Sequence, residues 1–235
     1  MTDISSKQLN LLKQWDTPTI CNGLEIIDAR YAASGFTTQQ MICSDSTLSP
    51  IVGFARTATI KARAPSSLPP DQQEEVSQAY YRHMAEEPNP TIAVIQDLDM
   101  PPGFGAWWGE VHTTVHKALG GLGVVTNGSI RDLGVCAPNF QMLAGNIGPS
   151  HGHVHVENVG CEVNIFSMLV KPGYIIHADR HGAVVIPPET VKDLPAIIEK
   201  LTQQEEVIIN AARSSQFTLD KFFKTRESTN TFSNH

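Results

Sequence analysis

The chain has 235 residues, and its 17 lysines and arginines are outnumbered by 24 aspartates and glutamates, which leaves a net charge of −7. This balance gives phosphate backbones no electrostatic reason to bind, so nucleic acid is not an expected partner. Hydrophobic residues make up 41% of the chain, but charges interrupt each apolar run well short of the length that spans a bilayer, so no membrane segment is expected.

The start of the chain and its cysteines indicate an expected location and exclude two kinds of cysteine motif. The start, MTDISSKQLNLLKQW, lacks the basic, apolar and small-residue regions of a secretory signal, so a cytoplasmic location is expected. Cys21, Cys43, Cys136 and Cys161 form no C-x-x-C pair, which argues against a zinc knuckle or a dithiol redox motif. We expect a single domain over residues 1–225 and a disordered tail over residues 226–235.

The first half of the chain predicts alternating helices and strands. Thr17 is the expected cap of the second helix, and Asp71 with Glu74 resembles a capping box at the start of a third. Apolar spacing and β-branched runs give the order: helix 6–15, a helix from Thr17, strand 51–61, a helix from Asp71, strand 91–98, helix 110–119 and strand 122–126.

The second half predicts antiparallel β-structure followed by helices. Short apolar runs separated by Pro-Gly and glycine turns indicate strands at 153–159, 162–170, 174–177 and 183–186. A long helical pattern then begins near Leu194, with Pro195 expected to kink it, and Thr218 is expected to cap a last helix. The chain is therefore expected to be a single α/β domain with a mixed β-sheet core and a β-rich second half.

A glycine-rich loop at residues 103–109 precedes the helix that begins at Glu110. Amides in the first turn of a helix lack intrahelical partners and lie at the positive end of the helix dipole, so they favour a carboxylate or phosphate. A glycine loop before a helix is also commonly no more than a turn, so this motif alone is weak.

An adjacent Arg131-Asp132 pair follows the strand that ends at Thr126 and the turn Asn127-Gly128. The planar guanidinium of Arg131 fits a substrate carboxylate in two-pronged fashion. The carboxylate of Asp132 is a hard oxygen ligand of the kind that a magnesium-type ion prefers. From spacing alone, a surface ion pair or an aspartate helix cap is the slightly favoured interpretation.

Three blocks in order resemble one known family: GAWWGEVHTTVHKALG, GLGVVTNGSIRDLGV and VKPGYIIHADRHGAVVIPPE. They are similar to the family that contains 4-hydroxy-4-methyl-2-oxoglutarate aldolase and the regulator of ribonuclease activity A. The resemblance spans most of the chain and implies a fold like the swivelling β/β/α domains, assembled as a trimer or a dimer of trimers. It also implies that a neighbouring subunit completes each site.

The resemblance also implies roles for individual residues. Arg131 would bind the substrate carboxylate, and Asp132 would bind a divalent metal cation, Mg²⁺ or Mn²⁺. Glu110 stands where the family has an acidic residue that positions metal-bound water, which makes Glu110, Arg131 and Asp132 the expected catalytic set. The expected substrate-binding set consists of Arg131 and the backbone of Gly109, Glu110, Val111 and His112. Asn127 departs from the family, in which an aspartate is common before the glycine.

The implied chemistry is cleavage of a carbon–carbon bond in a small 2-oxo acid to give pyruvate. Retro-aldol cleavage of 4-hydroxy-4-methyl-2-oxoglutarate and decarboxylation of oxaloacetate pass through the same enolate, whose negative charge a Lewis acid stabilises. A Schiff-base route would need a desolvated lysine, whereas Lys117 and Lys171 lie on a helical polar face and beside a turn.

Two other functions stay open from the sequence. The first is a non-catalytic trimeric regulator that binds a protein partner such as a ribonuclease. The second is a metalloenzyme built on the histidines, because His151, His153 and His155 would face one way on a strand, with His177 and His181 following in a later strand and turn. A polar sheet face or a trimer interface explains the same histidines without a metal.

Overall fold

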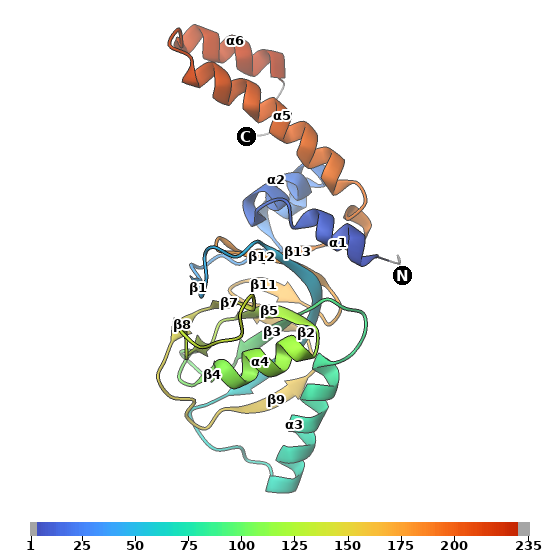
Figure 1. The fold of residues 1–235 in the computed structure, drawn as a ribbon, viewed down its shortest axis with the longest axis vertical. Helices are drawn as coiled ribbons and strands as arrows, with labels where there is room; N and C mark the ends of the chain where they lie inside the picture. Colours follow the sequence, from blue (N-terminus) through green and yellow to red (C-terminus); the bar gives the residue numbers. More distant parts are fainter. Residues whose placement is uncertain (1–3, 230–235) are drawn as a thin grey trace.

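The computed structural model describes residues 4–229, and it has a curled mixed sheet with helices around it and a helical arm at one end (Figure 1). The expected α/β class with a mixed sheet is confirmed. The main sheet has the order β1-β7-β5-β3-β2-β12-β13, and β9 also pairs with β2. Its strands are β1 (Ile42–Cys43), β2 (Ile51–Lys61), β3 (Thr91–Asp97), β5 (Gly121–Thr126), β7 (Gln141–Ala144), β9 (His155–Val159), β12 (Ile175–Asp179) and β13 (Gly182–Ile186).

Strands β2, β3, β5 and β7 run parallel, while β1, β9, β12 and β13 join the sheet antiparallel. Strand β2 is the centre of this arrangement, and each of its residues except Lys61 is buried. A strand covered on both faces is typically rich in apolar and β-branched residues, and most of its sequence, IVGFARTATIK, fits this pattern. The two longest predicted strands in the first half thus correspond closely to β2 and β3.

Two smaller sheets complete the β-structure. The residues predicted as one strand at 162–170 instead form a hairpin of β10 (Val163–Ile165) and β11 (Met168–Val170). The chain reverses at Phe166 and Ser167, which have positive φ angles of 48° and 76°. A three-stranded parallel sheet combines β4 (Ala106–Trp108), β6 (Ser129–Ile130) and β8 (Asn146–Ile147).

The observed helices differ from four of the expectations drawn from the sequence. Helix α2 is capped by Asp16, whose carboxylate accepts the amide of Thr19 at 2.9 Å, and not by Thr17. Helix α3 begins at Pro70 without a side-chain cap, so the capping box at Asp71 is wrong. Pro195 lies in the first turn of α5, where its missing N–H costs nothing, so it starts the helix and does not kink it. The helices are α1 (Ser6–Leu12), shorter than predicted, α2 (Thr17–Ile27), η1 (Ala29–Ala33), α3 (Pro70–Met84), α4 (Glu110–Ala118), η2 (Pro188–Thr190), α5 (Leu194–Arg213) and α6 (Leu219–Thr229).

Helices α5 and α6 form an arm that projects from the sheet (Figure 1). Only Leu194 and Ile198, in the first turns of α5, are buried, and α6 buries no residue. Thr218 accepts the amide of Lys221 at 3.2 Å, as expected of a cap. The first four residues of the expected tail, 226–229, are helical, and residues 230–235 lie outside the described part of the chain. No helix within residues 4–229 is long and apolar enough to cross a bilayer.

Candidate functional site

The Arg131-Asp132 pair is positioned by the end of β5 and the turn that follows it. The side-chain oxygen of Asn127 accepts the amide of Asp97 at 2.7 Å, and its NH₂ donates to the carbonyl of Asp97 at 3.0 Å. Asn127 therefore fixes the end of β5 to the end of β3. An aspartate here could accept the first bond but not donate the second, so both bonds require asparagine.

The small parallel sheet then brings this segment to the start of α4. Ile130 in β6 pairs with Trp108 in β4, and the amide of Arg131 donates to the carbonyl of Trp108 at 2.8 Å. Gly109 follows Trp108, and Asp132 follows Arg131. The bond between Trp108 and Arg131 therefore makes Gly109 and Asp132 neighbours, although 22 residues lie between them.

Gly109 is required by the position of the Asp132 carboxylate. A Cβ at Gly109 would lie 2.3 Å from Oδ2 of Asp132 and 3.1 Å from Cγ of Arg131. The first distance is shorter than real Cβ contacts, and the second is tighter than most of them. Asp132 itself has a φ of 57°, a left-handed conformation that aspartate and asparagine adopt more readily than most residues.

Asp132 and Arg131 form one charged group at the N-terminus of α4. Oδ2 of Asp132 accepts the amide of Glu110 at 3.3 Å and lies 3.4 Å from Nε of Arg131. Both side chains are about a third exposed, so they are open to a ligand. Nε of Arg131 is buried but has no hydrogen-bond partner among the described residues, because its contact with Asp132 has ion-pair distance without hydrogen-bond geometry.

Helix α4 contributes the remaining backbone groups. Its first intrahelical bond runs from the amide of Thr113 to the carbonyl of Gly109, so the amides of Glu110, Val111 and His112 precede the helical ladder. The side chains of Glu110 and Val111 are exposed, whereas the ring of His112 packs against Trp107 with centroids 4.6 Å apart. The structure thus brings together Gly109, Glu110, Arg131 and Asp132, and turns the side chain of His112 away into an aromatic cluster.

The segment after Asp132 is tied to α4 by Thr113, whose hydroxyl accepts the amide of Ala137 at 3.0 Å. The thiol of Cys136 donates to the carbonyl of Asp132 at 3.2 Å. Burial, with added repulsion from Asp132 and Glu110, raises the pKa of Cys136. This thiol therefore stays protonated at neutral pH and is not poised as a nucleophile.

The donor set fits a magnesium-type ion better than a transition-metal cage. Within residues 4–229, no group of three or more histidine, cysteine, aspartate or glutamate side chains converges to hold a metal. A magnesium-type ion keeps several waters and needs only one or two protein carboxylates, a demand that the partly exposed Asp132 can meet.

The histidines do not form the one-sided group considered from the sequence. Of the alternating three, only His155 lies in β9, because that strand begins there. His177 is buried in β12 and contacts the hydroxyl of Thr17 at 3.0 Å, and its Nε2 donates to the carbonyl of Trp15 at 3.0 Å. Burial lowers the pKa of His177 to about 4, so it is a neutral residue that fastens α2 to the sheet.

The lysines considered for a Schiff base are engaged elsewhere. Lys117 donates to the carbonyl of Pro138, and Lys171 lies 3.6 Å from Glu162 with both side chains exposed.

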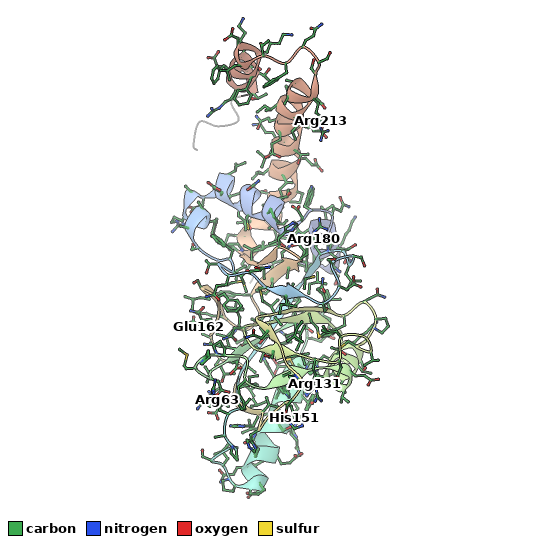
Figure 2. All side chains as sticks on the ribbon, turned by 90° about the vertical axis from the view of Figure 1, so that its left-hand side faces the viewer. Arg63, Arg131, His151, Glu162, Arg180 and Arg213 are labelled. Atoms are coloured by element: carbon green, nitrogen blue, oxygen red, sulfur yellow. The ribbon has the colours of Figure 1, made fainter. Side chains whose placement is uncertain are left out.

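Figure 2 shows Arg131 on the sheet domain and Arg213 far away on the arm. Sequence reasoning missed Gln73, Tyr80 and Tyr81 of α3, which lie beside His112 in a cavity, because no local motif signals that α3 packs there.

Comparisons with known proteins agree on the family. The family described as RraA-like, Aldolase/RraA, matches residues 17–185. The uncharacterized protein MJ0644 of Methanocaldococcus jannaschii is 35% identical over 103 residues, which cover 43% of this chain and 48% of that protein. Protein DlpA of Legionella pneumophila is 30% identical over 121 residues, which cover 48% of this chain and 19% of that protein. The matched segment thus spans half or less of these relatives.

Solved structures share the fold at lower identity. An uncharacterized protein from Pseudomonas syringae has a TM-score of 0.71 at 20% identity and covers 95% of this chain and 96% of its own. RraAS2 of Streptomyces coelicolor, described as an unusual member of the RNase ES inhibitor RraA protein family, has a TM-score of 0.68 at 19% identity and covers 88% and 97%. The family match over most of the chain, together with this shared fold, establishes that the chain belongs to the Aldolase/RraA family.

Proposed function

We propose that this protein is a divalent-metal-dependent lyase that cleaves a carbon–carbon bond in a small 2-oxo acid and releases pyruvate. The family includes both lyases and regulatory members, so membership alone does not decide between them. The observation that carries the proposal is the contact group of Gly109, Arg131 and Asp132. It combines a carboxylate-reading arginine and a hard oxygen ligand at the same helix N-terminus.

Arg131 and the start of α4 are the proposed binding groups for the substrate carboxylate. The guanidinium supplies a planar pair of N–H donors, and the buried Nε that lacks a hydrogen-bond partner is one of them. The amides of Val111 and His112 add neutral donors at the positive end of the helix dipole. Together they would hold a small acid in one orientation, which is the main requirement for a reaction that needs no covalent intermediate.

Asp132 is the proposed metal ligand, and Mg²⁺ or Mn²⁺ is the proposed cofactor. A divalent cation at this carboxylate supplies Lewis-acid stabilisation of the negative charge that develops on the substrate keto oxygen. Glu110, exposed in the first turn of α4, is proposed to position a water that accepts the hydroxyl proton of an aldol substrate and that delivers a proton to the enolate carbon. Retro-aldol cleavage of 4-hydroxy-4-methyl-2-oxoglutarate and oxaloacetate decarboxylation both fit these roles.

A homotrimer, or a dimer of trimers, is the proposed assembly. Exposed apolar side chains border the site, among them Val111 at 70%, Leu133 at 46% and Val135 at 58% exposure. Burying such side chains contributes about 1.5–3 kcal/mol each, so they favour contact with another subunit beside the site. The arm lies far from the site of its own chain (Figure 2), which leaves it available to a neighbouring copy.

The alternative is a non-catalytic trimeric regulator that binds a protein partner such as a ribonuclease. The description of RraAS2 as belonging to an RNase ES inhibitor family is the observation that favours it. Such a protein would slow cleavage of RNA by a purified RNase E-type enzyme at stoichiometric amounts, and Asp132→Asn would leave this inhibition unchanged.

Pyruvate release tests the lyase directly. Purified protein is mixed with oxaloacetate or 4-hydroxy-4-methyl-2-oxoglutarate, with Mg²⁺ or Mn²⁺, and pyruvate is measured before and after excess chelator. We expect release above the uncatalysed background that chelator removes and added metal restores. Release that survives chelator would contradict the metal role, and no release from either acid would favour the regulator.

A further inference from the structure

A cavity of about 460 Å³ lies between α3, β9 and the start of α4. Its lining includes the aromatic side chains of Tyr80, Tyr81 and Trp107 and the apolar side chains of Val154 and Val156. Tyr80 and Trp107 have ring centroids 5.0 Å apart, and Tyr81 packs edge-on against Tyr80 at 5.2 Å. Fixed rings of this kind favour a flat ligand, because stacking needs an extended planar face.

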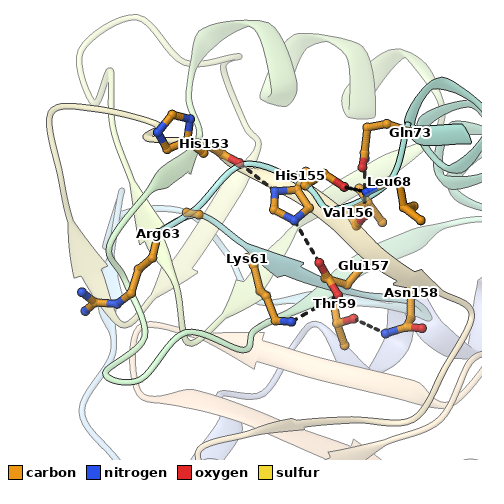
Figure 3. Close-up of polar contacts among 12 residues, drawn as sticks. Thr59, Lys61, Arg63, Leu68, Gln73, His153, His155, Val156, Glu157 and Asn158 are labelled. Atoms are coloured by element: carbon orange, nitrogen blue, oxygen red, sulfur yellow. Dashed lines mark hydrogen bonds and ion pairs between the residues drawn. The ribbon is translucent and has the colours of Figure 1, made fainter. Parts of the chain in front are cut away.

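Two buried polar atoms on the lining residues, Oε1 of Gln73 and Nδ1 of His112, have no hydrogen-bond partner within residues 4–229. The NH₂ of Gln73 lies 3.5 Å from the carbonyl of Val156, which can only accept, so this contact orients the amide (Figure 3). The opposite atom, Oε1, is buried and makes no hydrogen bond within residues 4–229. A buried acceptor without a partner is costly, and a donor brought in by a ligand would remove that cost.

His112 lines the same cavity with a neutral ring. Burial, followed by the charges of His116 and Arg131, lowers the pKa of His112 to about 3. Its Nδ1 is buried and has no hydrogen-bond partner within the described residues. The ring lies nearly parallel to that of Tyr81, at 15° with centroids 6.4 Å apart, so it extends the aromatic wall without adding charge.

Polar groups beside the cavity are paired with one another. Nδ1 of His155 lies 2.7 Å from the carbonyl of His153, and its Nε2 lies 2.9 Å from a carboxylate oxygen of Glu157 (Figure 3). Lys61 donates to the other carboxylate oxygen of Glu157 at 3.3 Å. The described residues that line the cavity include the carboxylate of Glu74 but no lysine or arginine, so the charge of the lining does not favour an anion.

We propose that this cavity binds a flat aromatic or heteroaromatic ring that carries an N–H or O–H donor, with the donor on Oε1 of Gln73 and the ring against Trp107 and Tyr81. The site is separate from the Arg131 and Asp132 group, since neither of these residues lines the cavity. It does not depend on the lyase proposal. Because the ring of His112 lies in this site while its amide belongs to the start of α4, an occupied cavity would contact the same turn that the proposed substrate uses.

Indole, 1-methylindole and cyclohexanol are the probes that separate the features of this site. Indole has a flat ring and a donor, 1-methylindole keeps the ring without the donor, and cyclohexanol keeps a donor without a flat ring. Binding is followed by NMR of methyl groups, with Val154 and Val156 in the cavity and Val207 and Ile209 on α5 as remote references. Saturable shifts at Val154 and Val156 with indole are expected, about five-fold tighter than with 1-methylindole and absent with cyclohexanol.

Two variants of α3 and one control test the assignment. Ser77→Trp fills the cavity and should abolish the indole shifts, whereas Gln73→Leu should remove the preference for indole over 1-methylindole. Gln72→Leu, at an exposed neighbouring position that does not line the cavity, should behave as wild type. The proposal is overturned if the cavity methyls show no saturable shift, if the references shift equally, or if the preference survives Gln73→Leu.

Discussion

The carboxylate of Asp132 lies directly against the Cα of Gly109, so closely that a Cβ there would be 2.3 Å from Oδ2. Only glycine permits this contact. The pairing of β4 with β6 creates it, and the amide of Glu110 completes it with a hydrogen bond at 3.3 Å. Position 109 therefore controls where the proposed metal ligand lies, although its own residue has no side chain.

Gly109→Ala should move Asp132 by the clearance that a Cβ requires while leaving the core intact. We expect kcat/KM for pyruvate release to fall about 100-fold, because displacement of a reacting group by about an ångström has effects of this size. Gly134→Ala is the matched control, since a Cβ at Gly134 meets nothing within 4 Å. Equal activities of the two variants in steady-state kinetics would contradict the assigned role of the contact.

Arg131→Lys keeps the positive charge and loses the planar fork. If Arg131 binds the substrate carboxylate in two-pronged fashion, KM should rise roughly 10-fold in Arg131→Lys and further in Arg131→Ala, since each hydrogen bond to a charged group contributes about 1.5–3 kcal/mol. Initial rates over a range of substrate concentrations separate KM from kcat. A normal KM in Arg131→Ala would rule out this binding role.

Leu133→Asp should dissociate the proposed trimer, because a charge would replace an apolar side chain beside the site that is 46% exposed in the single chain. Analytical ultracentrifugation should show a shift towards monomer, together with loss of turnover. Leu169→Asp, at a similarly exposed position in β11, is expected to leave the assembly unchanged. The interface assignment fails if Leu133→Asp sediments like wild type.

The lowered pKa of His112 predicts a stability that depends on pH. The unfolded chain takes up a proton near 6.5, whereas burial holds the folded-state pKa of His112 at about 3. Stability from this residue is therefore complete above pH 6.5 and is lost as the pH falls towards 3, by up to roughly 1.4 kcal/mol per pH unit.

His112→Phe keeps an aromatic ring and removes the titration. In urea unfolding between pH 8 and 5, the free energy of unfolding should fall less steeply for His112→Phe than for wild type. The difference between the two proteins at pH 8 reports packing alone. Parallel curves over the whole range would show that His112 does not contribute to the pH dependence.

Local patterns predicted most of the regular structure, and non-local pairing explains what they missed. Strand β2 is recognisable because burial on both faces favours a segment rich in small and β-branched residues. The hairpin at Phe166 and Ser167 was predicted as one strand, because neither residue signals the positive φ that the turn requires. Strands β4, β6 and β8 have two or three residues each, and their pairing depends on partners distant in the sequence.

In the candidate site, too, local motifs could be predicted from the sequence, whereas contacts that depend on non-local pairing could not. The sequence singled out Arg131 and Asp132 and the glycine before α4, since these are local motifs. It did not predict the contact of Gly109 with Asp132, because that contact arises from the register of β4 and β6. The cavity beside Gln73 was also missed, since it forms only where α3 packs against β9. The alternating histidines do not share one face of a strand, because β9 begins at His155.

The most direct measurement is metal-dependent pyruvate release by wild type and Asp132→Asn side by side, together with Mn²⁺ binding followed by electron paramagnetic resonance. Asparagine tolerates the left-handed backbone of this position and can still accept the amide of Glu110, so the variant removes the negative charge with little change in shape. We predict that wild type binds Mn²⁺ and releases pyruvate only with metal, and that Asp132→Asn does neither while remaining folded. Pyruvate release by Asp132→Asn at the wild-type rate would contradict the account.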